Sequence, residues 1–114
     1  MQIKDRDPKA FYFDIVQSIK HIHQFLDSGK IKTRREYQEH SLIKSAVERK
    51  LEVIGEAIDR IYKSDPSSSI TRYRQIIAAS NLINYECVFA DDAQVWNIIE
   101  KYLPLLNEEA KKLL

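Results

Sequence analysis

The chain contains few of the residues that break or crosslink a fold. Its 114 residues include two Gly, three Pro and one Cys, and a lone cysteine cannot form a disulfide within the chain. So few breakers, in a sequence rich in Lys, Glu, Ile and Leu, exclude a turn-rich β protein and predict an all-α one. No apolar run approaches the roughly 20 residues that a helix needs to cross a bilayer, and no signal sequence precedes the first helical pattern. We therefore expect one cytoplasmic domain over residues 1–114, with no membrane partner.

An excess of charge of one sign is also missing. The 18 Lys and Arg residues are balanced by 17 Asp and Glu residues, which gives a formal net charge of +1. A protein with so small a net charge has no global field that attracts a nucleic acid or an anionic membrane. Any contact with RNA must then come from a local group of residues.

Local start and stop signals divide the first half of the chain into helices. Asp7-Pro8 predicts the start of a first helix and Ser28-Gly29 predicts its end. Thr33 and Glu36 form a Thr-x-x-Glu capping box that starts a helix again, and the sequence leaves open whether this turn is kinked at His40. Because the connection is short, the two helices should be antiparallel neighbours. The predicted buried stripe of the first helix is Phe11, Ile15, Ile19, Ile22 and Leu26.

Similar start and stop signals divide the second half of the chain into helices. An apolar stripe predicts a long helix that ends at Ser64-Asp65-Pro66, and Thr71 is the expected cap of a short helix. Asp91 or Asp92 should cap the last helix, which is expected to bend at Pro104 with the proline facing solvent. The residues that keep one apolar phase across Pro104 are Val95, Ile99, Tyr102, Leu106 and Leu113. The predicted fold is an all-α up-down bundle of four to five helices.

Two segments together resemble one protein family. They are AVERKLEVIGEA at residues 46–57 and SNLINYECVFADDAQVW at residues 80–96. A long helix of this kind, followed by a short helix ending in Asn, a loop and an Asp-Asp-x-x-x-Trp start of the last helix, resembles the HepT-like branch of the HEPN family. The resemblance covers roughly residues 14–106. It implies a HEPN-like bundle that forms a homodimer and cleaves RNA without a metal or cofactor, as a toxin encoded beside a minimal nucleotidyltransferase antitoxin.

The catalytic motif of that family is altered in this chain. The family carries Arg-Asn-x-x-x-His-x-Tyr before the last helix, and the corresponding residues here are Ser80, Asn81, Tyr85 and Cys87. The resemblance implies that the arginine stabilises charge developing on the phosphate and that the histidine moves a proton during attack by the ribose 2′-hydroxyl. A serine hydroxyl cannot replace a guanidinium in that role, and tyrosine, with an ordinary pKa of about 10, is a weak general base at neutral pH. These substitutions predict RNase activity that is weakened or lost.

The motif tyrosine has a second role in related pairs. The resemblance implies that the antitoxin adds adenylate groups to it, and Cys87 stands in its place. Tyr85, two positions earlier, is an alternative acceptor that the sequence leaves open.

Candidate substrate-binding residues lie on two other segments. Arg49, Glu52 and Glu56 follow one another at steps of three and four, which places them on the face of the long helix opposite its apolar stripe. They form either a solvated face with intrahelical ion pairs or, as the resemblance implies, the wall of a dimer cleft. Arg72 and Arg74 could bind phosphate if they face that cleft, or could be solubilising arginines.

Three functional hypotheses follow from the sequence. The first is a HepT-like, RNA-targeting toxin component paired with a nucleotidyltransferase, with RNase activity weakened or lost. The second is a catalytically inactive subunit that still binds the nucleotidyltransferase. The third is a plain helical dimerisation module, which the near-zero net charge permits.

Overall fold

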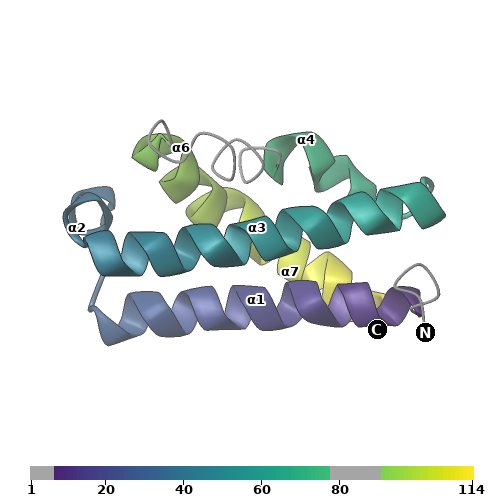
Figure 1. The fold of residues 1–114 in the computed structure, drawn as a ribbon, viewed down its shortest axis with the longest axis horizontal. Helices are drawn as coiled ribbons and strands as arrows, with labels where there is room; N and C mark the ends of the chain where they lie inside the picture. The colour runs from purple at the N-terminus through teal and green to yellow at the C-terminus, as the bar shows by residue number, and fades with distance from the viewer. Residues whose placement is uncertain (1–6, 78–90) are drawn as a thin grey trace.

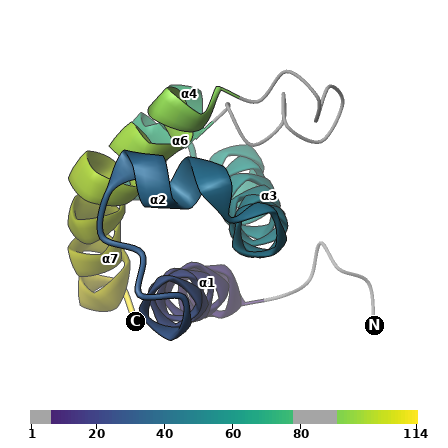
Figure 2. The same cartoon turned by 90° about the vertical axis from the view of Figure 1, so that its left-hand side faces the viewer.

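The computed structural model describes residues 7–77 and 91–114, and within these ranges the secondary structure is helical with no strand. Helices α1 (Pro8–Ser28) and α3 (Ser41–Ser64) lie side by side and antiparallel, and short α2 (Arg34–Glu39) joins them at one end (Figure 1). The rest of the fold packs over this pair as η2 (Ser69–Tyr73), α4 (Arg74–Ile77), α6 (Asp92–Asn97), η4 (Ile98–Tyr102) and α7 (Leu103–Lys112). Seen end-on in Figure 2, α3 and α7 lie on opposite sides above α1, and α2 crosses the near end. The predicted all-α bundle is confirmed.

The caps at the starts of α1, α2 and α6 are among those that the sequence predicted. Asp7 Oδ1 accepts a hydrogen bond from the Lys9 backbone N–H at 2.9 Å, at the start of α1. Thr33 and Glu36 form the reciprocal capping box at the start of α2. Of the two candidates for the last helix, Asp91 is the cap, because its Oδ1 accepts from the Ala93 N–H at 2.9 Å.

The structure resolves the junction at His40. Helix α2 ends at Glu39, and His40 adopts a non-helical conformation (φ −108°, ψ 82°). Its Nδ1 accepts a hydrogen bond from the Ile43 N–H at 3.3 Å and so caps α3. The chain is therefore broken here into two helices.

Thr71 does not have the predicted role. It lies inside η2, whose N-cap is Ser68, and its hydroxyl donates to the Ser68 carbonyl at 2.7 Å instead of accepting from a helix N–H. The Thr71 backbone N–H bonds to the same carbonyl at 3.0 Å. The tight turn places the Ser68 carbonyl within reach of the Thr71 hydroxyl. The hydroxyl therefore donates to this carbonyl and does not cap a helix N–H group.

The last helix continues past Pro104, as predicted. Pro104 is exposed near the start of α7, and the turn before it widens into the π-helical η4, in which the Leu103 N–H bonds to the Ile98 carbonyl. A proline has no N–H for the carbonyl four residues earlier and its ring crowds that carbonyl, so a wider turn relieves the clash. The wider turn also shifts the buried face: Leu103 and Ala110 are fully buried, whereas Tyr102 and Leu113 are only partly buried.

The core runs along the whole bundle. The predicted stripe of α1 is buried, with Phe11 at 8% exposure and Ile15 and Ile22 at 0%. It faces the α3 residues Val47, Leu51, Ile54, Ile58 and Ile61, which are all at most 1% exposed. Each such aliphatic side chain contributes about 1.5–3 kcal/mol on burial.

Within the described ranges, no helix has both the length and the apolar character of a bilayer span.

Candidate functional site

The four motif positions lie outside the described residues. Ser80, Asn81, Tyr85 and Cys87 fall within residues 78–90, so the roles assigned to them stay predictions. The structure does place the residues on either side of this segment, in α4 before it and in α6 after it. Both flanks are tied to α3 by ion pairs.

The upstream tie joins α4 to the C-terminal part of α3. Arg74 donates to Asp59 Oδ1 from Nη2 at 3.0 Å and from Nε at 3.3 Å. Its guanidinium also lies 4.1 Å from the centre of the Tyr62 ring, within the range of a cation–π contact. Lys63 bonds to the other oxygen of Asp59 at 3.0 Å. Hydrogen bonds from Lys63 and then Arg74 lower the pKa of the Asp59 carboxyl, so it stays ionised and holds α4 in place.

The downstream tie joins α6 to the first turn of α3. Lys44 Nζ lies 2.8 Å from Asp92 Oδ2, and the two side chains are only 26% and 18% exposed. Next to this pair, the Tyr37 ring of α2 packs on the Trp96 ring of α6 with centroids 5.7 Å apart. The start of α6 is therefore held by both a shielded ion pair and an aromatic contact.

Two titratable side chains, Glu48 of α3 and Tyr37 of α2, form a polar cluster with the Lys44–Asp92 pair. Burial raises the pKa of the Glu48 carboxyl, and the charges of Asp92 and Glu52 raise it further, while Lys44 opposes the shift. The Tyr37 hydroxyl is fully buried and has no hydrogen-bond partner in the described part of the chain. Burial, followed by the charges of Glu48 and Asp92, raises the pKa of this hydroxyl, which stays protonated. The cluster thus presents a carboxyl that retains its proton to higher pH than an exposed glutamate does.

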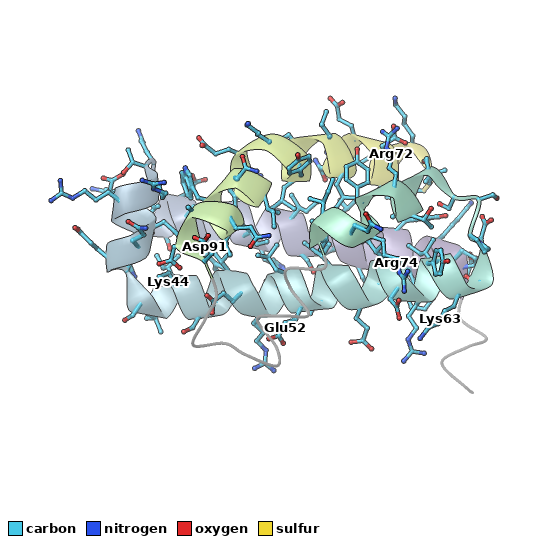
Figure 3. All side chains as sticks on the ribbon, turned by 90° about the horizontal axis from the view of Figure 1, so that it is seen from above. Lys44, Glu52, Lys63, Arg72, Arg74 and Asp91 are labelled. Carbon is cyan, nitrogen blue, oxygen red and sulfur yellow. The ribbon has the colours of Figure 1, made fainter. Side chains whose placement is uncertain are left out.

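The α3 residues proposed from the sequence are Arg49, Glu52 and Glu56. They lie between Lys44 and Asp59, the α3 partners of the two ion pairs. Lys44, Glu48, Glu52 and Asp59 recur at steps of four and seven and so share one face of α3. Glu52 is half-buried and lies on this face between the labelled ends of α3 in Figure 3. The other two residues are exposed and lie further around the helix: Glu56, which pairs with Arg60 at 3.6 Å, and Arg49.

The two arginines near the motif point in different directions. Arg72 bonds to Glu109 of α7 at 3.0 Å and to the Tyr73 hydroxyl at 3.2 Å, whereas Arg74 pairs with α3. Figure 3 shows the two side chains directed toward these different helices. The structure therefore separates Arg72 from the α3 face, and both guanidiniums are engaged by carboxylates.

Several residues of this region could not be found from the sequence. Lys44 and Asp92 are 48 positions apart, and no local pattern connects them. The one available signal was the Asp91-Asp92 pair, because only one of two adjacent aspartates can cap the helix and the other is free for another partner.

Within residues 7–77 and 91–114, no group of three or more His, Cys, Asp or Glu side chains is arranged to hold a metal ion.

These features define a helical bundle with one charged helix face, on α3, to which both flanks of the motif segment are tied. The family model described as "Ribonuclease HepT-like" matches residues 15–113. The chain belongs to this HepT-like ribonuclease family, as the resemblance predicted.

Two relatives come from Methanocaldococcus jannaschii. The protein named "Putative RNase MJ1380" is 27% identical over 108 residues, covering 93% of this chain and 95% of the relative. The protein named "Putative RNase MJ1216" is 27% identical over 110 residues, covering 96% of this chain and 88% of the relative. No solved structure matches the chain.

Proposed function

We propose that this protein is the RNA-targeting, toxin-type component of a pair with a minimal nucleotidyltransferase, and that it acts as a homodimer with weakened or lost RNase activity. The observation that carries the proposal is the family match over residues 15–113. In this proposal the segment 80–87 faces a cleft shared by two subunits, and it acts without a metal.

The two ties give a physical reason for this placement. Arg74–Asp59 and Lys44–Asp92 attach the flanks of the motif segment to one helix. The α3 face between them carries Glu52, with Glu56 and Arg49 beside it. A segment held at both ends loses less conformational entropy when it binds a substrate, which favours precise positioning of its side chains.

Among the proposed substrate-binding residues, Arg49 is best suited to contact a phosphate. It is exposed and has no carboxylate partner in the described part of the chain. Arg72 and Arg74 would first have to leave Glu109 and Asp59. We therefore assign phosphate contact to Arg49, and supporting roles to Arg72, Arg74, Glu52 and Glu56.

The test restores the family motif. Purified wild-type protein should cleave RNA slowly or not at all, and the double variant Ser80→Arg, Tyr85→His should cleave at least about 100-fold faster, since a general base alone contributes that much. Adding Arg49→Gln to the restored protein should raise KM, while Lys112→Gln, a matched exposed control, should not. An inert restored protein that is folded and binds RNA would refute a latent ribonuclease site.

The substitutions at Ser80, Tyr85 and Cys87 also favour a second candidate, a catalytically inactive subunit that binds the nucleotidyltransferase. Co-purification with a nucleotidyltransferase encoded in the neighbouring reading frame would support it. Mass spectrometry after incubation with that enzyme and ATP would show whether Tyr85 accepts adenylate. A plain dimerisation module would show neither RNA binding nor such a partner.

A further inference from the structure

One surface feature is not explained by the motif or by the ties. The connection from α1 to α2 carries four cations within six residues, Lys30, Lys32, Arg34 and Arg35, here called the basic turn. The chain has 18 basic against 17 acidic residues, so the rest of the chain is net negative without these four. Four of the 18 basic residues thus lie within residues 30–35, which makes this stretch locally positive in a nearly neutral protein.

The cations of the basic turn are available to a ligand. All four side chains are exposed. Arg35 forms an i,i+4 pair with Glu39 at 3.3 Å, with both side chains largely in solvent. Lys32 interacts electrostatically with the exposed Glu36 carboxylate, whereas Lys30 and Arg34 have no carboxylate partner in the described part of the chain. Two cations without a carboxylate and two whose partners are exposed leave this stretch accessible to an external anion.

The backbone that presents these cations is fixed. Ile31 is 6% exposed in the core, and its N–H bonds to the Leu26 carbonyl at 2.9 Å. Glu36 Oε1 accepts from the backbone N–H groups of Lys32 at 2.8 Å and Thr33 at 3.1 Å. These N–H groups are thus satisfied internally, so any attraction for an anion comes from the side chains. A rigid backbone also reduces the entropy lost on binding.

Lys30 occupies a conformation that favours glycine. Its φ of 55° is left-handed, and the bonds from Lys30 N–H to Asp27 O and from Ile31 N–H to Leu26 O close α1 in a Schellman motif. The glycine lies one residue earlier, at position 29, where an added Cβ would press on the terminal Cδ1 atom of Ile43. Lysine is an uncommon choice at the left-handed position, and such an outlier points to a role outside folding.

The basic turn lies at the end of the bundle where the chain returns from the motif segment. Helix α2, which follows the turn directly, packs on α6 through Tyr37 and Trp96. Figures 1 and 2 show α2 and α6 together at this end. An RNA strand held by the basic turn would therefore be close to the start of α6.

We infer that the basic turn is a binding site for the phosphate backbone of RNA, which rests on the proposed RNA-directed function. Backbone binding needs only cations, because it is driven by neutralised phosphates and released counterions. A protein partner would need an apolar or aromatic anchor, and the apolar residue within 30–35, Ile31, is buried. The chemistry of the turn fits a polyanion better than a protein surface.

The test measures binding of a labelled single-stranded 2′-O-methyl RNA, which cannot be cleaved through its 2′-hydroxyl, over a range of salt concentrations. The triple variant Lys30→Gln, Lys32→Gln, Arg34→Gln should bind at least 10-fold more weakly. Its slope of log K against log salt should fall by about 0.7 for each phosphate that is no longer neutralised. The control Lys20→Gln, Lys111→Gln, Lys112→Gln removes the same charge from exposed positions on α1 and α7 and should keep the wild-type slope.

Lys30→Gly separates binding from folding. Glycine suits the left-handed position, so the variant should melt a few degrees higher, about 2–4 °C, yet bind RNA several-fold more weakly. A raised melting temperature with unchanged RNA affinity would show that the turn is only structural and would overturn the inference.

The outcomes also distinguish this inference from the proposed function. Wild-type protein that shows no RNA affinity at low salt would refute both. Wild-type protein that binds RNA, with the triple variant equal in affinity and slope, would overturn the basic turn alone. A triple variant that binds RNA normally but no longer co-purifies with a nucleotidyltransferase would assign the turn to a protein partner and overturn the RNA site.

Discussion

At the residue scale, Tyr37 places a polar hydroxyl group inside the apolar core. Its ring packs on Trp96, but its buried hydroxyl has no hydrogen-bond partner in the described ranges. An unsatisfied buried polar group costs about 1–3 kcal/mol. We therefore expect Tyr37→Phe to stabilise the fold by about 1 kcal/mol, measured by urea unfolding.

Tyr73→Phe is the matched control for this substitution. Tyr73 is also buried, at 3% exposure, but its hydroxyl accepts a hydrogen bond from Arg72 at 3.2 Å. Its removal should leave stability unchanged or lower it by about 0.5–1 kcal/mol. If Tyr37→Phe were instead destabilising, the Tyr37 hydroxyl must have a partner.

Glu48 should make stability depend on pH. Burial raises the pKa of its carboxyl above the ordinary 4.5, so the folded protein binds this proton more tightly than the unfolded chain does. The resulting stabilisation is fully present below pH 4.5 and is lost as pH rises through the folded-state pKa. Glu48→Gln cannot ionise, so it should match the wild type in acid and become the more stable protein as pH rises toward neutrality.

Glu36→Gln provides a control of opposite sign for that pH series. A hydrogen bond from the Lys32 backbone is the largest cause that lowers the pKa of Glu36 from its ordinary 4.5. Its carboxylate stabilises the fold above pH 4.5, and this contribution is lost as pH falls through the lowered pKa. Urea unfolding from acid to neutral pH should therefore show the two variants diverging in opposite directions. Parallel curves would contradict the assignment for Glu48.

At the scale of elements, the Lys44–Asp92 pair is the contact that fixes α6 on α3. Its side chains are 26% and 18% exposed, so solvent screens it less than the pairs on the outer surface. A double-mutant cycle with Lys44→Ala and Asp92→Ala should give a coupling energy of about 1 kcal/mol. The same cycle on Arg35–Glu39, with side chains 88% and 68% exposed, should give less than about 0.5 kcal/mol. Equal couplings would mean that burial does not strengthen the inner pair.

The same contrast explains what the sequence could reveal about the elements. The caps at Asp7, Thr33 and Asp91 were predictable because donor and acceptor lie within three residues of each other. The break at His40 was not, since it depends on a side-chain acceptor that competes with a continuous helix. The ties of Arg74 and Lys44 were not predictable either, because each partner is brought close only by the packing of distant helices.

At the scale of the whole molecule, periodicity predicted the bundle because each helix must bury one apolar stripe. It could not show what covers the opposite faces, and here the candidate site lies on such a face. The cations of the basic turn were visible as a dense run, Lys30 to Arg35. The balanced total charge concealed them, because a net charge averages over the molecule whereas an RNA strand contacts only one part of it.

The proposed homodimer is the last property that belongs to this scale. Val53 lies on the outer face of α3 between Arg49 and Glu56, and it is 39% exposed. If this face meets a second subunit, Val53→Glu would place a charge in a desolvated contact and should dissociate the dimer without unfolding the bundle. Light scattering should give twice 13.4 kDa for the wild type and 13.4 kDa for the variant, with equal helicity by circular dichroism.

Leu105→Glu is the control for that experiment, because Leu105 is 52% exposed on α7, which lies on the opposite side of the bundle from α3 (Figure 2). It introduces the same charge at a similarly exposed apolar residue and should remain dimeric. A Val53→Glu protein that stays dimeric would exclude the α3 face as the contact. A wild type of 13.4 kDa at all concentrations would remove the shared cleft, and the motif segment of one subunit would then have to act alone.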